Sequence, residues 1–150
     1  MVFRRKAARR PSLTVLAAAV AVLAARNGAE AADGPSVSRR AHAAHLTRML
    51  QAEELKQSLL DAADSNAVAS VLRDARRLQP LLGAEHEYWT SAGDRRALAL
   101  SDRNRQALDR VILTSRQGDA DAAYNSVLAL AESCAACHDD HPERRIVVGK

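Results

Sequence analysis

Residues 119–142 read DADAAYNSVLALAESCAACHDDHP, and this stretch contains both cysteines of the 150-residue chain. Asp119 can cap a helix, and the apolar residues that follow recur at steps of three and four. The resulting stripe consists of Ala123, Val127, Leu130, Ala131, Cys134 and Cys137. The spacing therefore predicts a helix whose buried face continues into the two cysteines.

Three earlier segments have the same helical periodicity. Residues 37–63 contain no Gly or Pro, can be capped by a serine, and predict a long helix. Residues 68–78 predict a shorter helix that Pro80 ends, and residues 81–93 are expected to form a connection. Residues 94–117 predict a third helix. Four amphipathic helices without a strand pattern predict an all-α fold, an antiparallel four-helix bundle.

The first 31 residues have the layout of a cleaved secretory signal peptide. Five basic residues and no acid lie in residues 1–12, the apolar run Leu13–Ala25 follows, and Ala29-Glu30-Ala31 offers a cleavage site. The alternative is a membrane anchor, but the run of 13 residues is shorter than the roughly 20 that cross a bilayer. We therefore expect an exported, periplasmic protein whose mature domain is residues 32–150.

The basic character of the chain belongs largely to this signal. Six of the 22 basic residues and one of the 18 acidic residues lie in residues 1–31, which leaves 16 and 17 and a formal charge of −1. Such a mature chain gives no electrostatic reason to expect a nucleic-acid partner. It contains one Trp, two Tyr and no Phe, which is few aromatic residues for one domain.

Cys134, Cys137 and His138 occupy positions i, i+3 and i+4, so they share one face of the predicted helix. A haem with two vinyl groups needs two thiols about one helical turn apart, and its iron needs an imidazole beside the second thiol. C-x-x-C-H provides this arrangement and is the sequence signal for covalent c-type haem. Thioether formation would use both thiols and leave the exported protein without a free cysteine.

Other interpretations of the two cysteines are weaker. A zinc site needs about four ligands, and His141 offers a further one, but no second Cys or His pair has the spacing of a zinc site. A disulfide or redox dithiol suits an oxidising compartment, but thioredoxin-like enzymes place C-x-x-C near a βαβ pattern that this sequence lacks. Coincidental spacing is the remaining alternative. Haem attachment is favoured over all three.

In this arrangement the chain resembles the class II cytochromes c, a family that comprises the cytochromes c′ and their low-spin, six-coordinate relatives. Those proteins carry C-x-x-C-H at the C-terminal end of a four-helix chain, commonly followed by Asp-Asp, an aromatic and a basic residue. Here the motif continues as Asp139-Asp140-His141-Pro142, so the last two positions differ. The resemblance implies one covalently attached haem c on Cys134 and Cys137, with His138 as the proximal iron ligand.

The sixth iron position decides what such a protein does. In the low-spin relatives a methionine of the first helix binds iron, whereas in five-coordinate members a bulky apolar residue blocks that position. Met49 is the only methionine of the mature chain and lies on the inward stripe of the first predicted helix. We expect Met49 to be the distal ligand, with His45 and an open site as the alternatives.

Several other residues receive an expectation. Three arginines of the first helix could pair with the haem propionates or be solvated: Arg39, Arg40 and Arg48. His42 and His86 are expected at the surface. Tyr88 and Trp89 are expected to pack under the connection between the second and third helices.

These patterns predict a periplasmic monohaem electron carrier that exchanges electrons with redox partner proteins. No catalytic constellation is visible, so we do not expect an enzyme. The alternative is a five-coordinate protein that binds nitric oxide or carbon monoxide. A haem-free domain with a Cys134–Cys137 disulfide is a third reading, and the resemblance makes a homodimer conceivable because dimers are frequent in that family.

Overall fold

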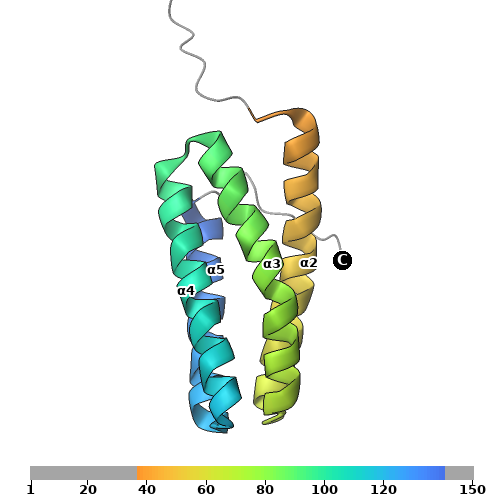
Figure 1. Cartoon of the computed structure of the whole chain (residues 1–150), viewed down its shortest axis with the longest axis vertical. Coiled ribbons are helices and arrows are strands. Elements are labelled where there is room, and N and C mark those ends of the chain that lie inside the picture. The colour runs from red at the N-terminus through yellow and green to blue at the C-terminus, as the bar shows by residue number, and fades with distance from the viewer. Residues whose placement is uncertain (1–36, 141–150) are drawn as a thin grey trace, which may run out of the picture. The chain divides into compact units, whose positions relative to one another are not determined.

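The computed structural model describes residues 37–140, which form four helices joined by short turns (Figure 1). The helices are α2 (Arg39–Asp64), α3 (Val68–Ala92), α4 (Arg95–Gln117) and α5 (Ala120–Asp140). Successive helices run in opposite directions, and each packs against the helices that precede and follow it, while α2 also packs against α5. Residues 37–140 contain no strand. The predicted antiparallel four-helix bundle is confirmed.

The helix ends follow local sequence signals. Ser38, Asp94 and Asp119 each accept a hydrogen bond from a backbone N–H group in the first turn of α2, α4 and α5. These side chains satisfy donors that a helix start leaves unpaired. Gly93 and Gly118 end α3 and α4 with φ values of 70° and 74°, a left-handed conformation that glycine adopts without strain.

The second helix is longer than the sequence predicts. α3 continues through Pro80 to Ala92, so the expected connection at residues 81–93 is wrong. Proline removes one backbone hydrogen bond from a helix, at a cost of about 3 kcal/mol. Beyond it, however, α3 buries a face whose members are each 3% exposed: Leu82, Glu85 and Trp89. The burial of this face explains why the helix continues.

The end of the bundle with the α2–α3 and α4–α5 turns is closely packed. Its core side chains are at most 1% exposed: Leu59, Val71, Leu108, Val111 and Val127. We call this region the filled end. Burying such side chains is the main favourable contribution to folding, roughly 1.5–3 kcal/mol for each.

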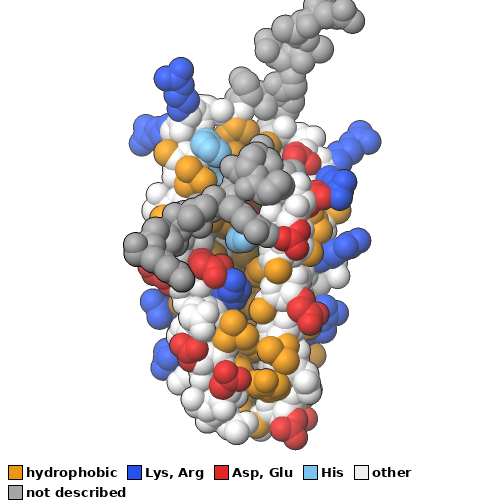
Figure 2. Space-filling view, turned by 180° about the vertical axis from the view of Figure 1, so that it is seen from behind, with side chains coloured by type: hydrophobic (Ala, Val, Ile, Leu, Met, Phe, Trp, Pro, Cys, Tyr) orange, Lys and Arg blue, Asp and Glu red, His pale blue; other side chains and the backbone are white. Residues whose placement is uncertain are grey.

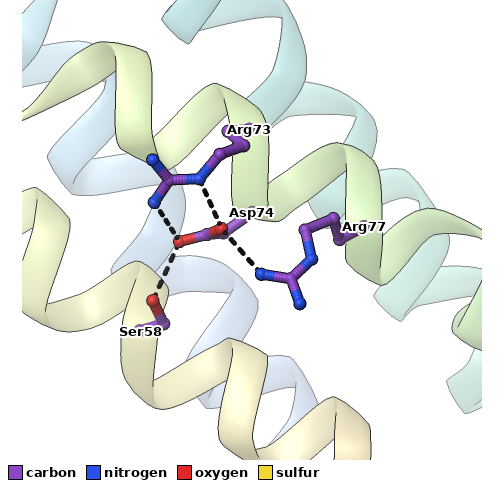
Figure 3. Close-up of polar contacts among 4 residues, drawn as sticks. All are labelled: Ser58, Arg73, Asp74 and Arg77. Carbon is purple, nitrogen blue, oxygen red and sulfur yellow. Dashed lines mark hydrogen bonds and ion pairs between the residues drawn. The ribbon is translucent and has the colours of Figure 1, made fainter.

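One carboxylate is buried at the filled end (Figure 3). Asp74 of α3 is 1% exposed and accepts hydrogen bonds from Ser58 Oγ of α2 at 2.8 Å and from Arg73 Nε at 3.0 Å. Arg77 Nη1 lies 3.5 Å from Asp74 Oδ1. The Arg73 hydrogen bond is the main reason that the pKa of Asp74 is lowered, although burial acts in the opposite direction. Asp74 therefore stays charged at neutral pH and links α3 to α2.

Charged side chains flank a hydrophobic band on one face of the bundle (Figure 2). Figure 2, the view from behind, shows hydrophobic side chains along the middle of that face with acidic and basic side chains on both sides. Among the described residues, no helix is sufficiently long and apolar to span a membrane. The expected signal peptide at residues 1–31, and His141 and Pro142 of the extended motif, lie outside the described residues.

Candidate functional site

A cavity lies in the half of the bundle opposite the filled end. All four helices line it: α2 between His45 and Lys56, α3 between Leu78 and Trp89, α4 at Asn104, and α5 between Cys134 and His138. The volume of this cavity is about 50 Å³, and the space between its walls is about 640 Å³ when the part open to solvent is included. α2 and α5 pack together less extensively than the other neighbouring helices, which leaves room between them.

The structure brings the predicted site residues together around this cavity. Cys134, Cys137 and His138 line it from the last turns of α5, and Met49 lines it from α2. Cys137 is 6% exposed, whereas the other three are half-buried. The i, i+3, i+4 spacing on α5 explains why both sulfurs and the imidazole reach the same space.

The environment of the thiols does not suit a redox dithiol. Burial, with a smaller contribution from the negative charge of Glu85, raises the pKa of the Cys134 thiol to about 12. Enzymes that use C-x-x-C for disulfide exchange lower the pKa of the attacking thiol, because the thiolate is the nucleophile. Cys134 is a protonated thiol at neutral pH.

The two candidate distal ligands differ in how firmly they are held. The His45 ring is 3% exposed, stacks on Tyr88 at a centroid distance of 4.0 Å, and meets the edge of Trp89 at 5.4 Å. His45 already lines the cavity, but moving its ring further inward would disrupt both aromatic contacts. Met49, one turn further along α2, also lines the cavity and has a flexible, unbranched side chain. This difference favours Met49 over His45.

Two buried polar residues of the cavity wall were not predicted. Glu85 is 3% exposed, accepts a hydrogen bond from Trp89 Nε1 at 3.3 Å, and has its pKa raised by burial. Asn104 of α4 accepts a hydrogen bond from Ser133 Oγ of α5 at 2.6 Å. Glu85 was missed because residues 81–93 were assigned to a connection. The three- and four-residue steps from Leu82 to Glu85 and Trp89 were the signal that could have revealed it.

The expected positive charges near the cavity come from a different residue. Arg39, Arg40 and Arg48 are not part of the cavity wall, whereas Lys56 of α2 is. Lys56 Nζ donates a hydrogen bond to Glu53 Oε2 at 2.7 Å, and both side chains line the cavity. Lys56 is thus the cation placed to interact with a carboxylate of a bound group.

Two histidines expected at the surface have partners instead. His42 is half-buried, and its Nδ1 lies 3.0 Å from the Tyr88 hydroxyl. His86 is also half-buried, with Nδ1 at 3.2 Å from Asp102 Oδ1. Tyr88 itself belongs to α3 rather than lying under a loop. The aromatic residues therefore join the bundle and help to form its cavity end.

The donor set of the cavity fits a covalently bound haem. Two thiols lie one helical turn apart, an imidazole follows directly, and a thioether is supplied by another helix of the same cavity. Leu78, Leu82 and Trp89 provide an apolar wall. Within residues 37–140, no group of three or more His, Cys, Asp or Glu side chains is arranged to hold a metal ion alone. Comparisons with protein-family models, curated proteins and solved structures found no match to this chain.

Proposed function

We propose that this protein is an exported monohaem c-type cytochrome that carries single electrons between redox partner proteins. The observation that carries the proposal is the meeting of Cys134, Cys137, His138 and Met49 around one cavity of a four-helix bundle. A bound haem would supply reversible one-electron exchange at its iron. The residues of the chain attach it, complete its coordination and limit the access of water.

Cys134 and Cys137 attach the haem in this proposal. Each thiol adds across one vinyl group, so that sulfur bonds to one carbon, the thiol hydrogen moves to the other, and no net oxidation occurs. Both thiols lie in the wall of a folded bundle, and burial keeps that of Cys134 protonated. Attachment is therefore expected before the bundle closes, when the thiols are still accessible.

In this proposal His138 of α5 and Met49 of α2 would bind the iron. His138 offers a neutral imidazole nitrogen, the usual proximal ligand of a haem protein. Met49 offers a thioether, which favours the reduced iron and raises the reduction potential relative to a second histidine. The aromatic contacts that hold His45 in place support this assignment.

The visible spectrum of the purified mature protein tests the proposal. We expect a pyridine haemochrome typical of two thioether links, and sharp bands in the dithionite-reduced protein that do not change with carbon monoxide. The Cys134→Ala, Cys137→Ala variant should carry no covalent haem. Wild-type protein that binds no haem after production with a haem-attachment system would contradict the proposal.

Substitution of Met49 tests the distal ligand. Met49→Ala is expected to convert the low-spin spectrum to a high-spin one and to admit carbon monoxide to the reduced iron. Leu50→Ala is the matched control, because Leu50 is the next residue of α2 and is 40% exposed. If the wild-type spectrum already responds to carbon monoxide, the sixth position is open and the protein is a gas-binding cytochrome. A low-spin spectrum unchanged by Met49→Ala would transfer the ligand role to His45.

A further inference from the structure

Aromatic side chains are concentrated beside the cavity although they are rare in the chain. Residues 37–140 contain three Trp, Tyr or Phe residues, and two of them, Tyr88 and Trp89, are neighbours on α3. Both are buried, at 7% and 3% exposed, with ring centroids 5.0 Å apart. Trp89 lines the cavity, whereas Tyr88 contacts the first turns of α2 through His42 and His45.

Each of these two rings has a base at its acidic hydrogen. The indole Nε1–H of Trp89 donates to Glu85 Oε1 at 3.3 Å. The hydroxyl oxygen of Tyr88 lies 3.0 Å from His42 Nδ1, which accepts the phenolic proton in the tautomer that carries hydrogen on Nε2. Trp and Tyr are the side chains most readily oxidised by one electron, and both lose a proton when this happens. A paired base makes that loss direct.

We propose that Trp89 and Tyr88 form a two-step path that carries an oxidising equivalent out of the cavity, with Glu85 and His42 as the proton acceptors. The path runs from the cavity wall to the start of α2, where His42 is half-buried. It does not require a bound haem, so it stands independently of the electron-carrier assignment. Its role is to reduce a small oxygen-centred radical in the cavity to its anion before the radical attacks Met49 or Cys134, whose sulfur atoms are readily oxidised.

The two steps balance in electrons and protons. In the first, Trp89 gives one electron to the oxidant and its indole proton to Glu85. In the second, Tyr88 gives one electron to the indole radical, which recovers its proton from Glu85, and the phenolic proton moves to His42. The net result is a reduced oxidant, a neutral Tyr88 radical and a protonated His42. A small external one-electron donor of the ascorbate or thiol class then restores Tyr88, and His42 returns the proton.

His45 contributes to the path by positioning the rings of Tyr88 and Trp89. It stacks on Tyr88 with an angle of 6° between the ring planes and meets Trp89 edge-on at 74°. These contacts fix two of the three aromatic residues against one buried side chain of α2. The distance between the electron donor Tyr88 and the acceptor Trp89 is therefore fixed by packing.

Pulse radiolysis with the azide radical provides the test, because this oxidant removes one electron from tryptophan. The full mature chain with Cys134→Ser and Cys137→Ser is used, since these changes remove both haem attachment and the thiols that would compete for the oxidising equivalent. Helical circular dichroism verifies the fold. We expect the Trp89 radical to decay while a tyrosyl radical appears at the same rate, independently of protein concentration.

Matched variants locate the path. Tyr88→Phe should abolish the tyrosyl signal and leave a long-lived Trp89 radical, whereas Tyr124→Phe should change nothing, because Tyr124 packs against the main core cluster. His42→Asn should slow the transfer at least several-fold, whereas His86→Asn should not. A tyrosyl signal that survives Tyr88→Phe, or a Trp89 radical that decays only by collision between molecules, would overturn the proposal.

The haem-bearing wild-type protein gives a second measurement if the serine variant does not fold. In that protein the azide radical again removes one electron from Trp89, and Tyr88 returns the electron to Trp89 while its phenolic proton moves to His42. Freeze-quenched electron paramagnetic resonance should then show a tyrosyl radical that is lost in Tyr88→Phe and retained in Tyr124→Phe. Its absence from a haem-bearing protein would reject the path and leave the proposed electron carrier intact, since haem content is measured separately.

Discussion

The two ends of the bundle are built from the same four helices but bury different kinds of side chain. The filled end has Leu and Val side chains that leave no more than 1% of their surface exposed. The cavity end buries His45, Glu85 and Asn104 around open space. Buried polar groups cost stability unless they are hydrogen-bonded. The filled end is therefore suited to holding the fold, and the cavity end to holding a ligand.

Two carboxyl groups of α3 make the contrast specific. Asp74 and Glu85 are 11 residues apart, about three helical turns, and both are buried. Asp74 has three hydrogen-bonding or charged partners in Ser58, Arg73 and Arg77, and its pKa is lowered. Glu85 accepts a hydrogen bond from neutral Trp89, and burial raises its pKa. Partners, not burial alone, decide which charge state the fold favours.

The largest expected effect is at the cavity end, where burial should slow the alkylation of the Cys134 thiol. Because its pKa is raised from 9.0 to about 12, the thiolate fraction near neutral pH falls on the order of 10³-fold. In haem-free Cys137→Ser protein, iodoacetamide should therefore modify the folded chain about 10³-fold more slowly than the urea-unfolded chain. Mass spectrometry over time measures both rates. Similar rates would mean that the cavity wall at Cys134 is open to water.

The next effect concerns packing at the filled end. Leu108→Ala removes a side chain that is 1% exposed and leaves a void, so we expect the free energy of unfolding to fall by about 2–5 kcal/mol. Urea denaturation should show a lower midpoint with an unchanged slope. Leu113→Ala is the control on the same helix, because Leu113 is 55% exposed and its loss should cost less than about 0.5 kcal/mol. Equal losses would mean that the filled end is not closely packed.

Asp74→Asn is expected to lower the free energy of unfolding by about 1–3 kcal/mol at neutral pH, because it weakens a buried, charge-assisted network. The lowered pKa of Asp74 means that its contribution is present above the unfolded value, about 3.9, and is lost as pH falls through the folded value. The difference in the free energy of unfolding between wild type and Asp74→Asn should therefore become smaller at acidic pH. Exposed Asp109 offers the control Asp109→Asn. A difference between wild type and Asp74→Asn that persists at low pH would show that the charge of Asp74 does not cause the loss of stability.

Helix periodicity and capping residues predicted the bundle, and spacing alone placed Cys134, Cys137 and His138 on one face. Met49 was expected at the same site from its inward position on the first helix and from the family resemblance, and it lines the cavity, whereas its role as a ligand stays a prediction. The second half of α3 was not predicted, because Pro80 is a strong local signal against a helix and only tertiary packing overrides it. Glu85 and the Tyr88–His42 contact depend on that half of α3 and were missed with it, although the helical spacing from Leu82 to Trp89 was a local signal for Glu85.

The smallest expected effect is that of Glu85 on stability, and its pH dependence is opposite to the one expected for Asp74. The raised pKa of Glu85 means that its contribution to stability is present below the unfolded value, about 4.3, and is lost as pH rises through the folded value. In haem-free protein, Glu85→Gln should therefore raise the free energy of unfolding by about 1 kcal/mol at pH 8 and leave it nearly unchanged at pH 4. Urea denaturation at both pH values measures this, with exposed Glu87→Gln as the control. A lower free energy of unfolding for Glu85→Gln than for wild type at pH 8 would contradict this. It would mean that a partner in the cavity stabilises the Glu85 carboxylate, as Arg73 stabilises that of Asp74.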